Sequence, residues 1–93
     1  MESIARRITV KGRVQGVGFR AFVMQHVQRL GVDGFVRNRK DGSVEVLCVG
    51  DEAQVDEMIT LCYTGPTAAR VQEVDVQPAQ GIVDKGFKQL PTV

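Results

Sequence analysis

A chain of 93 residues has room for one domain, because single domains run from about 50 to 250 residues. Hydrophobic residues make up 43% of the sequence and charged residues 25%, which is typical of a globular protein and excludes a disordered chain. The formal net charge is only +1, but the charges are divided unevenly along the chain. We therefore expect a single globular domain over residues 1–93.

Basic and acidic residues are concentrated in different parts of the chain. Residues 1–40 carry nine Lys and Arg against two acidic residues, and residues 41–93 carry three against nine. A basic surface can attract an anion such as a phosphate ester or a nucleic acid, because summed surface charge raises the local anion concentration. If the two parts interleave in one sheet, however, the charges compensate each other in space. The sequence leaves both interpretations open.

The cysteine content and the N-terminal sequence indicate the cellular compartment of the protein. Cys48 and Cys62 are too few for a disulfide framework and lack metal-ligand spacing, which predicts two free thiols in a reducing environment. Residues 1–7 contain no apolar run suited to a signal peptide, and no stretch of about 18 apolar residues occurs anywhere. We expect a cytoplasmic protein with no membrane contact.

A strand followed by a helix opens the predicted fold. Residues 8–14 alternate apolar and polar side chains, the two-residue period of a half-buried strand. Lys11 and Arg13 belong to its polar side and are expected in solvent. After a glycine-rich turn, apolar side chains recur with the helical spacing up to a stop at Gly31: Phe19, Phe22, Val23, His26, Val27 and Leu30. On this stripe His26 is interpreted as a half-buried packing residue.

A hairpin and a second strand–helix–strand arrangement follow. Asp41 and Gly42 separate two apolar runs, 34–37 and 44–49, which predicts a hairpin whose loop holds two or four residues. Asp51 and Gln54 form a capping-box pattern that begins a second helix, which ends at residues 64–66. Residues 71–76 are predicted as a fourth strand, stopped by Pro78. Residues 86–90 are predicted as a short last strand, the weakest of the elements.

The order of these elements, βαββαβ in fewer than 100 residues, is the ferredoxin-like arrangement. It predicts an α+β sandwich in which two helices pack on one face of an antiparallel sheet. In such a sheet the first and third strands are central, with the second strand beside the third. The fold alone does not decide function, because it carries binding modules as well as enzymes.

One loop has the composition of an anion site. It joins the first strand to the N-terminus of the first helix and contains Gln15, Gly16, Val17, Gly18, Phe19 and Arg20. Amides at a helix N-terminus lack intrahelical partners, and the helix dipole favours an anion there. Glycines allow the positive φ that lets such a loop curl around a phosphate-sized group. Arg20 could bind two phosphate oxygens with its planar fork.

Other phosphate and nucleic-acid motifs fit this loop poorly. Gly16, Gly18 and Ala21 match the spacing of a dinucleotide fingerprint, but a Rossmann domain does not fit into 93 residues. The loop also lacks the Gly-Lys-Ser/Thr of a Walker A site. Residues 18–23 have some likeness to an RNA-binding segment, but Phe19 and Phe22 fall on the helical core stripe. RNA binding is therefore only a minor alternative.

Two longer segments have a distinctive sequence: residues 12–20 read Gly-Arg-Val-Gln-Gly-Val-Gly-Phe-Arg, and residues 36–45 read Val-Arg-Asn-Arg-Lys-Asp-Gly-Ser-Val-Glu. In this order the two segments resemble the acylphosphatase family. The likeness continues through residues 30–35 and 65–71, so it covers nearly the whole chain, with Phe35 where tryptophan is common. This resemblance implies the ferredoxin-like fold and hydrolysis of acyl phosphates to a carboxylate and inorganic phosphate.

The resemblance also implies roles for individual residues. The loop from Gln15 to Arg20 would bind the phosphoryl group, Arg20 would be the catalytic arginine, and Asn38 would position the attacking water. No metal or cofactor is expected. The carboxylate leaving group has a conjugate acid of pKa roughly 4 and needs no protonation, so the protein has mainly to position groups and neutralise charge. An amide can hold a water by donating and accepting together.

Three alternatives remain at this stage. The same loop could hold a phosphate without turnover, in a regulatory binding module. The module could be related to the N-terminal domain of the carbamoyl-transferring proteins that mature hydrogenases. The basic part of the chain could bind nucleic acid weakly. We expect instead a monomeric enzyme acting on a small-molecule acyl phosphate, with no nucleic-acid partner.

Overall fold

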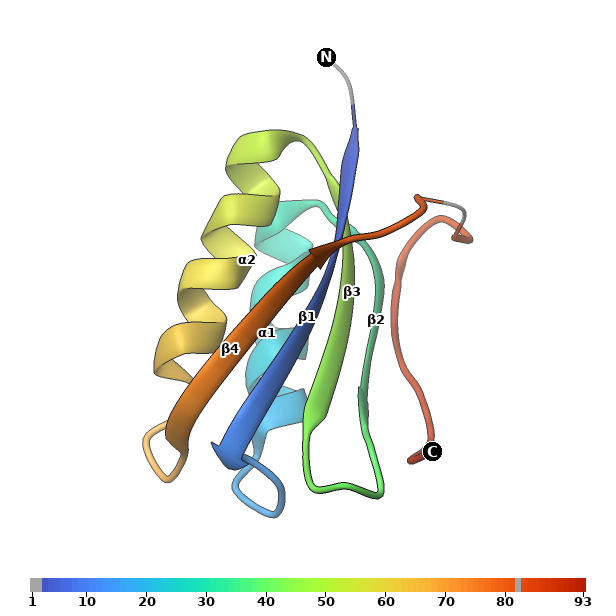
Figure 1. Cartoon of the computed structure of the whole chain (residues 1–93). Helices are drawn as coiled ribbons and strands as arrows, with labels where there is room; N and C mark the ends of the chain where they lie inside the picture. The colour runs from blue at the N-terminus through green and yellow to red at the C-terminus, as the bar shows by residue number, and fades with distance from the viewer. Residues whose placement is uncertain (1–2, 82) are drawn as a thin grey trace.

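The computed structural model describes residues 3–81 and 83–93, which form a five-stranded sheet covered on one face by two helices (Figure 1). The elements in chain order are β1 (Ile4–Arg13), α1 (Phe19–Leu30), β2 (Asp33–Asn38), β3 (Val44–Gly50), α2 (Glu52–Thr64), β4 (Arg70–Pro78) and β5 (Phe87–Gln89). The βαββαβ order and the ferredoxin-like α+β class are confirmed.

The strands lie in the order β4-β1-β3-β2-β5, so β1 and β3 are central as predicted. Ile8 pairs with Val46 of β3 on one side and with Val76 of β4 on the other, all in antiparallel ladders. β2 also pairs antiparallel with β3 and ends with Asn38 opposite Val44. In this arrangement β1 and β2 both end at the same end of the sheet. The loop before α1 and the β2–β3 hairpin lie near each other there (Figure 1).

Both helices begin and end where the sequence predicts. Gly31 ends α1 in a left-handed conformation with φ 71°, and its N–H donates to the carbonyl of Val27. Asp51 caps α2: its side chain accepts from the backbone N–H of Gln54, whose side chain in turn accepts from the N–H of Asp51. The predicted capping box is thus confirmed.

The core lies between the helices and the sheet. It is built from alternate residues of the central strands and from one stripe of each helix: Ile8, Val10, Val44, Val46, Cys48, Phe19, Val23, Val27, Leu30, Val55, Met58 and Cys62. Both cysteines are free and fully buried, as expected of small apolar residues. His26 is half-buried and packs edge-on against the ring of Phe22.

Several boundaries differ from the sequence-based expectation. β1 begins at Ile4, four residues earlier than predicted, and β4 runs on through Pro78. Pro78 fits because β4 is an edge strand, where a missing N–H need not break a ladder. The hairpin loop holds neither two nor four residues: a hydrogen bond from Arg39 N to Ser43 O closes a loop of Lys40, Asp41 and Gly42.

The last strand is formed, although only three residues long, and it runs parallel to β2. The antiparallel expectation therefore holds for β1 to β4 but not for β5. The cause is topological, because β4 and β5 occupy opposite edges and the chain crosses between them. Beyond β5, the N–H of Leu90 donates to Val36 O, so the pairing to β2 continues past the strand.

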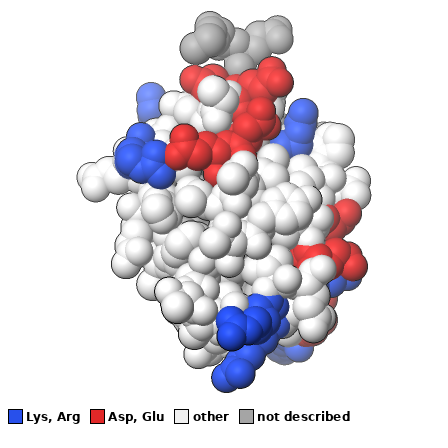
Figure 2. Space-filling view, turned by 90° about the vertical axis from the view of Figure 1, so that its left-hand side faces the viewer, with Lys and Arg blue, Asp and Glu red and all other residues white. Residues whose placement is uncertain are grey.

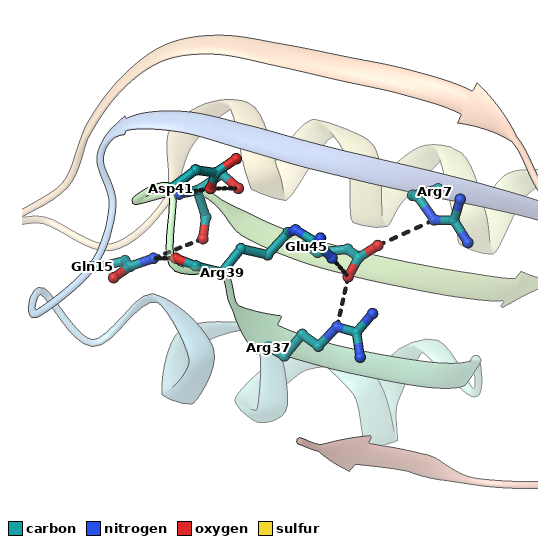
Figure 3. Close-up of polar contacts among 7 residues, drawn as sticks. Arg7, Gln15, Arg37, Arg39, Asp41 and Glu45 are labelled. Carbon is teal, nitrogen blue, oxygen red and sulfur yellow. Dashed lines mark hydrogen bonds and ion pairs between the residues drawn. The ribbon is translucent and has the colours of Figure 1, made fainter. Parts of the chain in front are cut away.

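Basic and acidic parts of the chain interleave in this sheet. Glu45 of β3 forms ion pairs with Arg7 of β1, Arg37 of β2 and Arg39 of the hairpin (Figure 3). Lys11 lies 3.9 Å from Glu73 of β4. Much of the charge asymmetry is therefore compensated in space. Among the described residues, neither helix is long and apolar enough to cross a membrane.

Candidate active site

The loop between β1 and α1 has the backbone shape of an anion site. Gly16 and Gly18 adopt φ of 72° and 82°, in the left-handed region that glycine enters without strain. Gly18 is the N-cap of α1, no side chain caps the helix there, and its first turn carries no acidic residue. The free amides at this helix N-terminus therefore face the loop without a competing negative charge.

Arg20 lies in the first turn of α1 and is half-buried. Its guanidinium forms no ion pair with any carboxylate in residues 3–81 and 83–93. It contrasts with Arg29 in the last turn of the same helix, which pairs with Glu57 of α2. A guanidinium without an acidic partner beside open helix amides is suited to an anionic ligand.

Asn38 is the last residue of β2 and is 9% exposed. Its side-chain amide makes no hydrogen bond within the described part of the chain, and no fully buried side-chain nitrogen or oxygen there lacks a partner. The amide is therefore open to a ligand or a water. The backbone of residues 38–40 is hydrogen-bonded to the C-terminal residue, because Val93 N donates to Asn38 O and Lys40 N donates to Val93 O.

Arg20 and Asn38 line the same small cavity, of about 170 Å³. The residues around it come from the loop, α1 and the ends of β2 and β5: Val14, Gly16, Gly18, Phe19, Arg20, Ala21, Asn38 and Gln89. The distance between the two predicted site residues could not be fixed from sequence, and the fold brings them together across the β1–α1 loop. The ring of Phe19 is buried in the core, so it fixes the end of the loop to the core.

Gln15 and Val17 do not line this cavity. Val17 is half-buried and packs against the core. The side-chain Nε2 of Gln15 donates to the carbonyls of Arg39 and Ser43, at 2.7 and 2.8 Å, on the hairpin that follows Asn38 (Figure 3). Both of its N–H groups are thereby used, so its side chain has no donor left for a phosphoryl group.

The sequence missed one polar residue of the cavity, Gln89 of β5. A signal was present, because Gln89 has the same strand parity as Phe87, which packs against the core. A glutamine at that parity indicates a solvent-accessible position on the helix-covered face of the sheet. The signal was obscured because the pairing of the last strand could not be predicted.

Unpaired positive charge gathers at this end of the molecule. Arg13 and Arg70 face each other in the β1–β4 ladder, both are exposed, and neither forms an ion pair within the described residues. Figure 2 looks onto the helix-covered face and shows acidic side chains with Lys or Arg beside them at one end, and a group of Lys or Arg at the other. The basic end is the one where the β1–α1 loop lies in Figure 1. A positive end beside Arg20 attracts anionic ligands.

Metal-ligating side chains do not gather here. Within residues 3–81 and 83–93 no group of three or more His, Cys, Asp or Glu is placed to hold a metal ion. Burial raises the pKa of both Cys48 and Cys62 to about 12, so neither thiol is a nucleophile near neutral pH.

The fold agrees with comparisons to known proteins. The acylphosphatase family model matches residues 6–89. The acylphosphatase of Rhizorhabdus wittichii is 52% identical over 92 residues, which cover 99% of this chain and 93% of the relative. The crystal structure of acylphosphatase from Bacillus subtilis superposes with a TM-score of 0.87 at 33% identity, over 94% of this chain and 98% of that one. The chain belongs to the acylphosphatase family.

A similar fold also occurs within a much larger protein. The full-length HypF crystal structure matches 98% of this chain with a TM-score of 0.90 at 28% identity, but the match covers only 12% of the HypF chain. The acylphosphatases of Rhizorhabdus wittichii and Nitrobacter hamburgensis match over 93% and 100% of their own length, at 52% and 48% identity. The comparisons therefore favour an enzyme of the acylphosphatase class over a module of the hydrogenase-maturation kind.

Proposed function

We propose that the cavity between the β1–α1 loop and the end of β2 is the active site, where the bond between the phosphoryl group and a carboxylate oxygen of an acyl phosphate is hydrolysed. The observation that carries the proposal is that Arg20 and Asn38 line one cavity with Gly16 and Gly18, and that no side chain in the described part of the chain engages either of them. The products are a carboxylate and inorganic phosphate, and no metal or cofactor takes part.

Arg20 and the loop amides bind the phosphoryl oxygens. The substrate carries its negative charge on these oxygens, and the amides at the N-terminus of α1 together with the guanidinium neutralise it. Because the amides are fixed by the positive-φ glycines and by the helix, little reorganisation is needed as charge shifts in the transition state. Gln15, Val17 and Phe19 contribute through their backbone and through the shape of the loop.

Asn38 holds the attacking water. Its amide accepts one hydrogen bond and donates another, so it presents an oxygen lone pair of the water toward phosphorus. Attack forms a bond from water oxygen to phosphorus while the bond from phosphorus to the acyl oxygen breaks and the carboxylate leaves with its electron pair. The proton of the water passes to a phosphoryl oxygen of the substrate, because an amide is not a base and the leaving group has a conjugate acid of pKa roughly 4.

The substrate is a small-molecule acyl phosphate, and the enzyme acts as a cytoplasmic monomer without nucleic-acid or membrane partners. In the described part of the chain only Tyr63 and Val93 are large apolar side chains with substantial exposure, and they form no broad patch of the kind that mediates dimers. Two free, buried thiols suit a reducing compartment. Light scattering of the purified protein checks the monomer, and an apparent mass of twice 10.2 kDa contradicts it.

The test is hydrolysis of benzoyl phosphate in EDTA by the wild type, Arg20→Ala and Asn38→Ala. We expect turnover by the wild type and a loss of at least about 100-fold in both variants, since each removes a group needed in the transition state. The matched control is Arg29→Ala, which removes an exposed arginine from the other end of the same helix. Phosphate binding without turnover by the wild type contradicts the proposal and favours a regulatory binding module.

Asn38→Asp separates positioning from base catalysis. The carboxylate is a stronger base than the amide but adds a negative charge beside a phosphoryl group, so we expect turnover at pH 7 to fall. A rise in turnover at pH 7 contradicts proton transfer to the substrate's own phosphate.

A further inference from the structure

The side chain of Gln15 links the β1–α1 loop to the β2–β3 hairpin by hydrogen bonds. Gln15 Nε2 donates to Arg39 O at 2.7 Å and to Ser43 O at 2.8 Å, and it is half-buried where it does so (Figure 3). The two carbonyls belong to the residues that close the hairpin loop, since Arg39 N donates to Ser43 O at 2.9 Å. The Gln15 amide thus contacts both sides of the hairpin loop at once, next to the end of β2 and the start of β3.

The hairpin that receives these bonds is itself well ordered by local contacts. The side chain of Asp41 accepts from Ser43 N at 2.9 Å and from Ser43 Oγ at 2.6 Å, and Gly42 N donates to Arg39 O at 3.0 Å. Such an Asx-type turn restricts the loop without help from the rest of the chain. The contact with Gln15 is therefore not needed to form the turn, and its effect is to fix where the turn lies relative to the β1–α1 loop.

The consequence concerns Asn38, because it directly precedes Arg39. Asn38 ends β2 and leads into the hairpin, and Arg20 lies in the first turn of α1, directly after the loop. The distance between the water-holding amide and the phosphate-binding group therefore depends on how the loop and the hairpin are joined. We propose that Gln15 is a positioning residue, which holds the β1–α1 loop in register with Asn38 through the carbonyls of Arg39 and Ser43. This inference rests on the proposed roles of Arg20 and Asn38.

Gln15→Met tests the link. Methionine has a similar length and no donor, so it keeps the packing and removes both hydrogen bonds. A small displacement of a positioned water is costly in rate, and we expect kcat for benzoyl phosphate to fall by about 10-fold to 100-fold. Because the loop amides and Arg20 are untouched, the inhibition constant of inorganic phosphate should change by less than about twofold.

A matched control is available in Gln77→Met on β4. Gln77 is exposed, and its Nε2 donates to the side chain of Asp75, two residues away. The kcat and the phosphate inhibition constant of Gln77→Met are expected to equal those of the wild type. A kcat of Gln15→Met equal to that of Gln77→Met overturns the inference, and so does an equal loss in kcat and phosphate affinity.

A double-mutant cycle with Asn38→Ala identifies the path of the effect. If Gln15 acts through Asn38, then adding Gln15→Met to Asn38→Ala causes no further loss in kcat. A full additional loss in that background shows that Gln15 acts elsewhere and overturns the inference. Should Gln15→Met fail to fold, Gln15→Asn takes its place, since it keeps the donors on a shorter side chain and is expected to show a smaller loss of the same kind.

The same measurements distinguish failure of the inference from failure of the proposed function. Wild-type kcat retained by Asn38→Ala removes the role of Asn38 and the inference with it. Loss of activity in Asn38→Ala together with an unaffected Gln15→Met removes the inference alone.

Discussion

Glu45 on β3 accepts a hydrogen bond from Nε of Arg37 on β2, with 2.6 Å between the two atoms, on the sheet face opposite the helices. The Glu45 side chain is only 6% exposed, and Arg7 and Arg39 also contact it. Three guanidiniums therefore converge on one nearly buried carboxylate. They tie β1, β2 and β3 together on the face that the helices leave open (Figure 3).

This cluster predicts a pH-dependent part of the stability. Burial raises the pKa of Glu45, but the hydrogen bonds and charges of Arg37 and Arg39 outweigh it and hold the pKa below the ordinary value of 4.5. A carboxyl group whose pKa is depressed by folding stabilises the protein above its unfolded-state pKa, and the contribution is lost as pH falls through the folded-state pKa. We expect Glu45→Gln to lower the free energy of unfolding by about 1–3 kcal/mol at pH 7.

Urea unfolding from pH 7 to pH 3 checks this prediction. The difference between wild type and Glu45→Gln should begin to shrink as pH falls below 4.5, where the carboxyl group of the unfolded chain takes up a proton, and should be lost as the folded carboxylate is protonated at lower pH. Glu73→Gln is the control, since Glu73 lies 3.9 Å from Lys11 with both side chains exposed, and exposed pairs contribute about 0–1 kcal/mol. A difference that stays constant with pH would show that the charge of Glu45 does not matter.

The two cysteines are predicted to react only after unfolding. Cys48 and Cys62 have no exposed surface in the core, and burial raises the pKa of each thiol to about 12, so the reactive thiolate is scarce at pH 8. Native protein mixed with a disulfide reagent should release no chromophore on the timescale of seconds, while protein in concentrated guanidinium chloride should release two equivalents. Rapid labelling of the native protein would contradict the burial of these side chains.

Gly18→Ala is predicted to impair phosphate binding. Gly18 has φ 82°, with open space around the position of a Cβ. Alanine there meets no clash, but its left-handed backbone conformation costs about 1–2 kcal/mol of stability. Relaxation of that strain turns the helix amides away from the cavity, and we expect kcat/KM to fall by at least about tenfold.

The control for Gly18→Ala is Gly86→Ala. Gly86 also has a positive φ, of 102°, and open space, but it lies before β5 at the opposite end of β2 from Asn38. Both variants should lose similar stability in thermal unfolding, and only Gly18→Ala should lose activity. Equal activity in the two variants would mean that the backbone shape at Gly18 is not needed for catalysis.

Local patterns predicted most of this fold because each element carries its own signals. The Asp51 capping box and the stop at Gly31 are contained in a few neighbouring residues, and both agree with the structure. The start of β1 and the direction of β5 depend on pairing with distant strands, which no local pattern encodes. For that reason the strand boundaries were shifted and the parallel edge was missed.

The candidate site shows the same division. The β1–α1 loop and Arg20 could be chosen from the sequence because glycines and an arginine at a helix N-terminus suit phosphate, whereas Asn38 was chosen from the resemblance to the acylphosphatase family. The contact of Gln15 with the hairpin could not, since it joins residues 24 and 28 positions apart through backbone carbonyls that have no sequence signature. Gln89 depended on the same long-range information, because its place follows from the pairing of β5 with β2.

The arginines at the basic end are predicted to attract substrate from a distance. Arg13 and Arg70 are register partners that form no ion pair within residues 3–81 and 83–93, and they lie where β1 leads into the β1–α1 loop. Raising ionic strength from about 0.01 M to about 1 M shortens the screening length from about 30 Å to about 3 Å. We expect kcat/KM to fall roughly threefold to tenfold over this range, while kcat stays nearly constant because bound substrate is no longer steered.

The double variant Arg13→Gln/Arg70→Gln should remove most of that salt dependence. It is not expected to destabilise the protein, since directly opposed like charges in a ladder repel each other. Lys85→Gln/Lys88→Gln is the matched control, because it changes the net charge equally on the chain around β5, where Lys88 lies 3.8 Å from Asp84. If both double variants lower the salt dependence alike, the net charge and not the basic end attracts the substrate, and if neither does, the attraction comes from Arg20 itself.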